Sequence, residues 1–449
     1  MNTSSWALEH SAVSSELSRF IAEKLAQVRS ETRKPEHAIS PEFASLFAAA
    51  EKGDWRTATN HFAAVCNSFR QNQSDTSKSA VVYPTEWAAA SEIVGALHEF
   101  ATGEEHYAIK FAKDIITSIA PGSIYFAGTD AGRYLVTALS KSHPNAEPFF
   151  TLTQNALADH RSYLRYVRTM YGSRIYIPTE QDFTNIYDHY VEDALRRQKE
   201  NKLIPGEFFE EVDGKIQLTG QLSVMAINGT LSKLMFDKNP DREFYVEEGF
   251  PLDWMYPHVS PHGLILKINR QPLPELSDEL VQRDRAFWTD YVRPMIGDWL
   301  TFDTTAADIA VFVEKVHLNR EQTGFRGDPR FIQNGVTQRN FSKLRSSIGG
   351  IYAWRAQNSK ETAERKRMNQ EADLAFRQSF VLCPSSPEAV FRSVSLLVGQ
   401  KRFDDAILIA QSAINVQLQT SCDEQPQSHV RSQLASLLDQ IRKMKPSSH

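Results

Sequence analysis

The chain has 449 residues, of which 41% are hydrophobic and 10% aromatic, so it can bury sizeable cores and on length alone divides into about two to four domains. Its formal net charge is -5, and no block or stripe of Lys and Arg stands out, which argues against a nucleic-acid-binding protein. Cys66, Cys383 and Cys422 lie far apart and are odd in number. They favour neither a disulfide framework nor a zinc site, and a reducing compartment is the simplest interpretation.

The amino-terminal residues carry neither the basic nor the apolar segment of a signal peptide. No run approaches the ~18–20 consecutive apolar residues that a membrane-spanning helix needs. We therefore expect a cytoplasmic protein with no membrane insertion. An export signal that has been removed, and with it a periplasmic location, stays open as the alternative.

Residues 1–119 carry a helical pattern. From 41 to 70, two helical segments flank a Gly-Asp turn at the spacing of a tetratricopeptide-like hairpin. An ordinary helical hairpin is an equal alternative, because repeats normally occur in several copies. Residues 71–80 are polar and predict a surface loop. Further helices are expected over 3–29, 85–101 and 105–119.

Residues 120–272 carry the pattern of an α/β domain. An apolar run at 123–127 is followed by a polar turn and an amphipathic helix, the first unit of an α/β layer. A Val-Asp-Gly-Lys turn at 212–215 predicts a β-hairpin. Further strands are expected at 149–153, 174–177, 243–247 and 264–268, with helices between them. We therefore predict an α/β core with a mixed, mostly parallel, Rossmann-like sheet, flanked by N-terminal helices and a C-terminal helical region.

Beyond this domain the pattern returns to helix, first in a helical connector at 273–337 and then in helical repeats at 338–449. Thr305, with Asp308 three residues later, predicts a capping box and therefore a helix start. A Gly-Phe-Arg-Gly-Asp-Pro segment at 324–329 predicts a loop. Helices are expected over 277–299, 305–317 and 338–357.

The C-terminal region contains an internal repeat. Ala372 and Phe376 recur as Ala406 and Ala410 after 34 residues, which is the period of tetratricopeptide repeats. Residues 340–443 resemble that family, with a charged insert in the first copy from Asn358 to Arg367. The resemblance implies a short curved layer of helices that binds a peptide or a neighbouring domain. The alternative is that two copies only pack against the rest of the chain.

The turn after the first strand is the best candidate for a ligand site, because ligands of open α/β sheets bind beyond the carboxyl ends of the strands. Glycines in it permit a tight turn, an arginine offers an anion contact, and a helix N-terminus suits phosphate or carboxylate. The spacing matches neither a dinucleotide fingerprint nor a Walker loop, and a local capping turn is the alternative. The candidate residues are Gly128, Thr129, Asp130, Gly132 and Arg133.

Asn155 and Asp159 follow the second strand and share the edge of the sheet with Asp130 if the two strands are parallel. Two carboxylates and an amide there could hold a divalent ion or a sugar hydroxyl. Capping of the following helix by Asn155 or Asp159 is the favoured alternative.

A third cluster follows the strand at 243–247. This segment, rich in aromatic, acidic and histidine side chains, could bind a sugar or peptide, although aromatic packing around prolines is the commoner explanation. Two prolines preclude the regular helix that would bring its histidines to one zinc ion, so no metal or cofactor is expected. Its candidate residues are Asp253, Trp254, His258 and His262.

Three segments, IYFAGTDAGRY at 124–134, TLTQNALADHRSYLR at 151–165 and DKNPDREFYVEE at 237–248, suggest a family. They resemble the soluble region of protein-O-mannosyltransferase-like bacterial membrane glycosyltransferases, a family that began as a domain of unknown function. The chain is also similar to uncharacterised bacterial tetratricopeptide proteins that carry this region alone. In the membrane enzymes the catalytic acid and lipid-linked donor are expected in a membrane portion that has no counterpart here. The resemblance therefore implies a retained binding domain.

We expect a non-catalytic binding or assembly protein that uses its α/β domain and helical repeats to bind a protein, peptide or glycan. The partner is expected to be a protein or peptide at the repeats and a glycan or small anion at the α/β edge. The alternative is a soluble enzyme that acts on a phosphorylated or glycosylated small molecule at the 128–133 loop.

Overall fold

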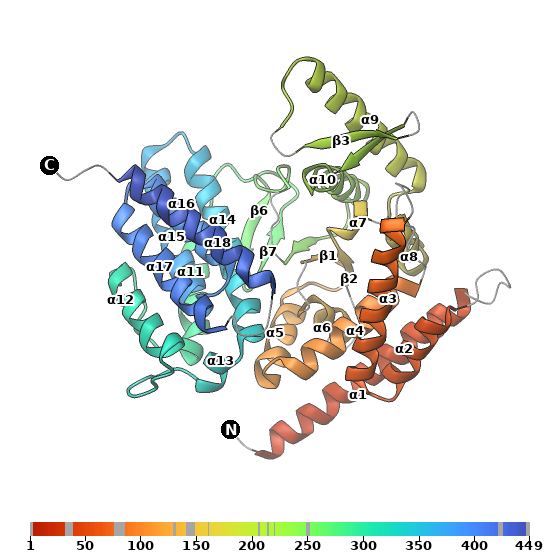
Figure 1. Ribbon diagram of the computed structural model, residues 1–449, viewed down its shortest axis with the longest axis horizontal. Coiled ribbons are helices and arrows are strands. Elements are labelled where there is room, and N and C mark those ends of the chain that lie inside the picture. Colours follow the sequence, from red (N-terminus) through yellow and green to blue (C-terminus); the bar gives the residue numbers. More distant parts are fainter. Residues whose placement is uncertain are drawn as a thin grey trace. The chain divides into compact units, whose positions relative to one another are not determined.

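The computed structural model describes residues 3–31, 39–75, 86–128, 132–140, 149–159, 161–204, 207–212, 215–219, 221–247, 252–420 and 425–445. Helix makes up 71% of the structure. The strands form both parallel and antiparallel pairs. The chain divides into two compact units, Met1–Met255 and Tyr256–His449. Figure 1 shows the helices and strands of both units. Among the described residues, no helix is both long and apolar enough to cross a membrane.

The first unit combines helices with a small parallel sheet. Its central strand is β1 (Ile124–Ala127), which pairs in parallel with β2 (Phe150–Thr153) and β5 (Phe244–Val246). All four residues of β1 are buried, as expected of a continuous apolar run between two neighbours. Since the three strands are parallel, their carboxyl ends lie at the same edge of the sheet. The predicted β-hairpin is confirmed as β3 (Phe208–Val212) and β4 (Lys215–Thr219).

The described helices of the first unit lie before and between these strands. Tyr134 of α6 occupies the space next to Gly95 of α4, where an added Cβ atom would lie 1.8 Å from the Tyr134 ring. This close approach fixes α6, which begins just beyond β1, against α4. The helices are α1 (Thr3–Glu31), α2 (Pro41–Glu51), α3 (Trp55–Asp75), α4 (Glu86–Thr102), α5 (Glu105–Ser118), α6 (Gly132–Leu139), α7 (Ala156–Asp159), α8 (Arg161–Tyr171), α9 (Glu180–Lys199) and α10 (Gln221–Lys238).

The second unit opens with the antiparallel pair β6 (Val259–His262) and β7 (Ile265–Ile268), and its other described regular elements are helices. The Thr305–Asp308 capping box is confirmed, because the side chain of each residue accepts the backbone N–H of the other. The helices are α11 (Asp278–Ile296), α12 (Ala306–Phe312), the π-helix η2 (Val313–Leu318), α13 (Pro329–Gln333), α14 (Gly335–Asn358), α15 (Thr362–Leu382), α16 (Pro387–Gly399), α17 (Phe403–Thr420) and α18 (Gln425–Met444).

Helices α14 to α18 pack in chain order, each against the next. At Gly349 of α14 an added Cβ atom would lie 2.7 Å from the Phe376 ring of α15, so glycine permits the contact between these two helices. The alanines of the predicted repeat, Ala372, Ala406 and Ala410, are all fully buried. The predicted helical region is therefore present, while its assignment to the tetratricopeptide family stays a prediction.

Three local predictions were wrong. Residues 174–177 are not a strand, because the N–H groups of Arg174 and Ile175 close a turn on the carbonyl of Tyr171. Helix α3 extends to Asp75, into the predicted polar loop. His262 ends strand β6 rather than lying in a loop. The Rossmann-like description of the core stays a prediction, since only three described strands of the first unit form its parallel sheet.

Candidate functional site

The carboxyl edge of the first unit's sheet is organised by Glu247, which directly follows β5. Its Oε2 atom accepts hydrogen bonds from the backbone N–H of Gly128 (3.1 Å) and the hydroxyl of Tyr125 (2.6 Å), both at or near the end of β1. The residue is only 2% exposed. Buried carboxylates are stable when hydrogen bonds compensate for the lost water. Glu247 therefore stabilises the backbone at Gly128, where the turn that the sequence singled out begins.

Arg133, in the first turn of α6, is the second charge at this edge. Its Nη1 donates to the carbonyl oxygen of Gly128 at 2.6 Å, and its Nη2 donates to the hydroxyl of Tyr134. The guanidinium carbon also lies 4.3 Å from the centroid of the Tyr134 ring. Burial lowers the pKa of Arg133, but Tyr134, Tyr163 and Glu247 raise it by more, so the side chain stays charged. These contacts hold the predicted anion-binding residue against its own turn.

Arg133 and Asn155 line one cavity of about 320 Å³, so the structure brings together two of the predicted site residues. Tyr163 also lines it, and the Tyr163 hydroxyl accepts the backbone N–H of Thr153 at the end of β2 (2.6 Å). Burial, followed by the nearby charge of Glu92, raises the pKa of Tyr163. The hydroxyl is therefore held neutral and already engaged as an acceptor.

The acidic residue of this cavity is Glu92 of α4. Its carboxylate lies 2.5 Å from the ammonium of Lys24 in α1 and accepts the hydroxyl of Tyr166 in α8 at 2.8 Å. Lys24 also contacts the Tyr166 hydroxyl at 2.5 Å. All three residues are buried. This Lys-Glu-Tyr triad joins three helices, and the sequence pattern did not reveal it because the partners lie 74 and 142 residues apart.

The other predicted residues of this edge have different places. Thr129 and Asp130 lie outside the described residues, as does the side chain of Asp159, the last residue of α7. Gly132 begins α6. The amide of Asn228 in α10 accepts the N–H of Ala158 (2.7 Å) and donates to the carbonyl of Asn155 (3.0 Å). A residue that the sequence analysis did not single out therefore supplies hydrogen bonds to the first turn of α7.

The third predicted cluster is divided between the units. In the first unit, Trp254 packs against Phe236 with ring centroids 5.1 Å apart, and its Nε1 donates to the hydroxyl of Ser232 (3.2 Å), while Asp253 is exposed. In the second unit, His262 pairs with Ile265 across the β6–β7 hairpin. The positions of Trp254 and His262 favour a structural role for these two residues.

His258 precedes β6 and has a structural role. Its Nδ1 lies 2.8 Å from the carbonyl oxygen of Asn269, and the Asn269 side chain donates to the carbonyl of His258 at 2.8 Å. Because a carbonyl can only accept, the Nδ1 atom must carry the proton. The pair of bonds closes the open end of the β6–β7 hairpin.

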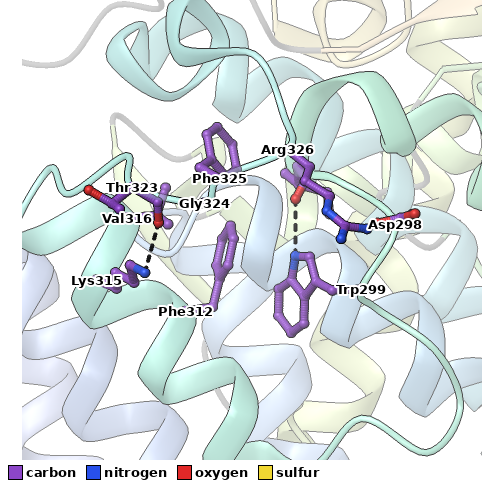
Figure 2. Close-up of a pocket in the computed structure, with 10 residues that line it drawn as sticks. Asp298, Trp299, Phe312, Lys315, Val316, Thr323, Gly324, Phe325 and Arg326 are labelled. Carbon is purple, nitrogen blue, oxygen red and sulfur yellow. Dashed lines mark hydrogen bonds and ion pairs between the residues drawn. The ribbon is translucent and has the colours of Figure 1, made fainter.

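A second cavity, of about 530 Å³, lies wholly within described residues of the second unit. Trp299 and Phe312 form one wall, with stacked rings 4.5 Å apart, and Phe325 lies 6.0 Å from Phe312 on the opposite loop. Figure 2 shows these rings beside Lys315 and Arg326. We call this site the aromatic pocket. Cavities of this size with apolar walls and a few polar groups are typical of ligand sites.

The aromatic pocket is held open by a fixed loop. Lys315 donates to the carbonyl of Thr323 (2.9 Å), and the N–H of Asp328 donates to the carbonyl of Met295 (3.2 Å). At Gly327 an added Cβ atom would lie 2.3 Å from the carbonyl oxygen of Met295, so only glycine lets the loop approach α11 this closely. Lys315 belongs to the π-helix η2, and π-helical turns are frequently found at functional sites.

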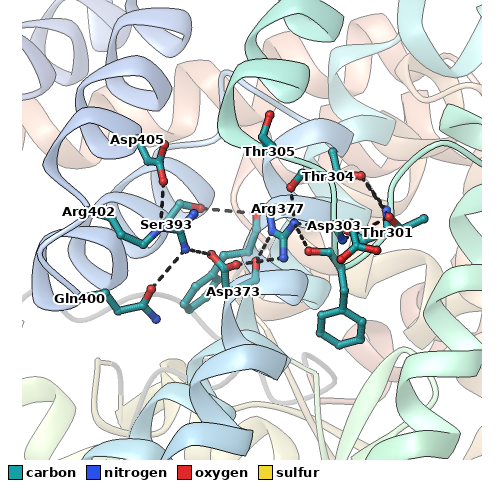
Figure 3. A network of polar contacts seen from close by, with 12 residues as sticks. Thr301, Asp303, Thr304, Thr305, Asp373, Arg377, Ser393, Gln400, Arg402 and Asp405 are labelled. Carbon is teal, nitrogen blue, oxygen red and sulfur yellow. Dashed lines mark hydrogen bonds and ion pairs between the residues drawn. The ribbon is translucent and has the colours of Figure 1, made fainter.

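A polar network in the same unit is structural. Arg377 of α15 pairs with Asp373 at 2.9 Å and donates to the carbonyl oxygens of Thr301, Phe302 and Thr304. Arg402 pairs with Asp373 at 3.2 Å and with Asp405 at 2.8 Å (Figure 3). Each arginine of the network has an acidic partner within the fold. The cluster therefore joins α15 to α17 and to the loop before α12.

No protein-family model, curated protein or solved structure matches the chain. The resemblance of residues 120–272 to the soluble region of membrane glycosyltransferases therefore stays a prediction. The sequence pattern predicts a loop at 324–329 but does not reveal the aromatic pocket. Its local signal is the pair of glycines that flank Phe325 and Arg326.

Proposed function

We propose that the chain is a non-catalytic binding protein that holds a protein or peptide partner in the aromatic pocket of its second unit. The observation that carries this proposal is a preformed cavity with walls of Trp299, Phe312 and Phe325 and charged groups at its rim. A rigid aromatic site loses little conformational entropy when a side chain enters it. Aromatic walls also add ring contacts to the burial of apolar surface.

The state of the charged groups at the sheet edge supports a non-catalytic role. A general acid or base must reach the reacting atoms of a substrate. Glu247 is engaged by Gly128 and Tyr125, and Glu92 is engaged by Lys24 and Tyr166. Protonation or release of either carboxylate would break contacts that join elements of the first unit.

The proposal can be tested by selecting peptides from a random display library on the full chain. We expect enriched peptides that bind the wild-type protein and lose at least tenfold in affinity on the Phe312→Ala variant, because truncation of an aromatic residue at the centre of an interface costs about 2 kcal/mol or more. Phe302→Ala is the matched control, since Phe302 is a 40% exposed aromatic residue that does not line the pocket. Failure to enrich any peptide, or equal losses on both variants, would contradict the proposal.

An enzyme at the sheet edge is the second candidate, since Arg133 and Asn155 share a cavity there as that hypothesis requires. Its substrate would be a phosphorylated or glycosylated small molecule. Thermal shift with sugar nucleotides tests it on the wild-type chain and on Asn155→Ala and Arg133→Lys variants. Stabilisation that is lost in both variants would favour the enzyme, whereas no stabilisation of the wild-type chain would count against it.

A further inference from the structure

Two cations and one carboxylate line the aromatic pocket, namely Lys315, Arg326 and Asp298. Glu321, which does not line the pocket, offsets the charge of Lys315. The charge that a partner can use is therefore that of Arg326, whose side chain is more exposed than that of Asp298. A partner group at this rim gains most if it carries one negative charge.

The two cations have different roles. Lys315 is committed to the loop, because its ammonium donates to Thr323 and lies 3.5 Å from the carboxylate of Glu321. The side chain of Arg326 is 78% exposed, and its Nη1 contacts Asp298, itself 53% exposed, at 3.4 Å. Exposed ion pairs of this kind contribute about 0–1 kcal/mol. Arg326 can therefore exchange this contact for a carboxylate of a partner at little cost.

The apolar surface continues beyond the cavity. Val311, on α12 directly before Phe312, is 64% exposed. It lies four residues before Lys315, and residues at this spacing share one face of a helix. A ligand that fills the pocket and extends along this face would cover Val311 as well. This favours a chain segment over a small compact molecule.

We infer that the partner segment is a peptide in which an aromatic or leucine side chain is directly next to an aspartate or glutamate. The apolar side chain enters between Phe312, Trp299 and Phe325, and the neighbouring carboxylate pairs with the guanidinium of Arg326. This inference rests on the proposed function and specifies its partner. A single carboxylate fits better than a phosphate dianion or a nucleic-acid backbone, because Asp298 lies beside Arg326 and repels a second negative charge.

Defined peptides test the inference on the full chain. Four capped hexapeptides, Gly-Ser-X-Z-Gly-Ser with X-Z equal to Asp-Phe, Asn-Phe, Lys-Phe or Asp-Ala, are titrated by isothermal calorimetry. We expect Asp-Phe to bind tightest, Asn-Phe about three- to tenfold weaker and Lys-Phe weaker still, since a charge-assisted contact to arginine is lost and then reversed. Asp-Ala should bind more than tenfold more weakly than Asp-Phe, because it lacks the phenylalanine side chain that enters the pocket.

Arg326→Gln should remove the preference for Asp-Phe over Asn-Phe and leave Asn-Phe affinity unchanged. Arg330→Gln is the matched control, since Arg330 is also exposed and paired with an aspartate but does not line the pocket. It should retain the full preference. Loss of the preference in both variants would overturn the inference.

The remaining outcomes separate this inference from the proposed function. Equal binding of Asp-Phe, Asn-Phe and Lys-Phe, with loss of Asp-Ala binding, overturns the acidic preference and leaves the binding function intact. If none of the four peptides binds, the inference is overturned, and the display selection then decides the binding function. If phenylacetate binds as tightly as Asp-Phe, the inference of a peptide partner is overturned, and the ligand is a small aromatic carboxylate instead.

Discussion

The sheet edge of the first unit and the aromatic pocket of the second use charge in opposite ways. At the sheet edge, Glu247 and Glu92 are buried and bonded to neighbouring elements, so their charges stabilise the fold. At the pocket, Arg326 and Asp298 are exposed and weakly paired, so their charges can be exchanged for those of a partner. Titratable groups near a cavity therefore do not by themselves identify a functional site, because their engagement within the fold decides what they can do.

The largest expected effect comes from a substitution that breaks the buried Lys-Glu-Tyr triad of the first unit. Lys24→Met should destabilise that unit by about 3–5 kcal/mol, since it leaves the Glu92 carboxylate buried without its cation. Arg19→Met is the control on the same helix, and it should cost little because Arg19 is half exposed. Chemical denaturation measures both. Adding Glu92→Gln to Lys24→Met should recover most of the loss, and a double variant as unstable as the single one would contradict this account.

Glu247→Gln tests whether the charge of Glu247 at the sheet edge stabilises the fold. It retains the shape of the side chain but removes the charge that accepts from Gly128 and Tyr125, and should cost about 1.5–3 kcal/mol in unfolding free energy. Glu243→Gln is the matched control, since this exposed glutamate also accepts a tyrosine hydroxyl. Peptide binding at the aromatic pocket should be unchanged in both variants. Reduced binding in Glu247→Gln alone would show that the two regions do not act separately.

Acidification tests the scaffold of the pocket through His317 of η2. Burial lowers the pKa of His317 to about 4, against 6.5 for an exposed histidine. The unfolded chain therefore binds the proton first, and stability falls as the pH drops from 6.5 towards 4. Between pH 7 and pH 5 the second unit should lose about 2 kcal/mol through this group. Thermal melts of His317→Gln should show less pH dependence than those of the wild-type chain, and equal slopes would exclude this role.

Gly327→Ala tests whether the loop holds the pocket open. An added methyl group would overlap the Met295 carbonyl oxygen, so the loop must shift, at a cost of about 1–2 kcal/mol. Peptide affinity should fall with it, because Phe325 and Arg326 directly precede this glycine. Gly335→Ala is the control, since its Cβ position is open. The affinities of the selected peptides for both variants are measured by calorimetric titration. Equal affinities for Gly327→Ala and Gly335→Ala would contradict the role of the loop.

Local sequence patterns predicted the element types well where the signal lies within a few residues. The Asp-Gly turn gave the β3–β4 hairpin, and the Thr305–Asp308 spacing gave the start of α12. They failed where a neighbouring element supplies the contact. Residues 174–177 have strand composition, but a turn on Tyr171 and the side chain of Asn239 take their N–H groups. The π-helical turn η2 had no local signature and was missed.

The sequence by itself determined a predominantly helical chain, its parallel strand β1 and the turn that follows it, because periodicity, glycines and caps act over one or two helical turns. Only the tertiary structure decided the use of the charges. Glu247 reaches Gly128 from 119 residues away, so a distant residue holds the backbone directly after β1. Arg326 stays exposed because Gly327 and Lys315 fix its loop beside Phe312. Burial and pairing depend on contacts between distant segments, and no local pattern specifies them.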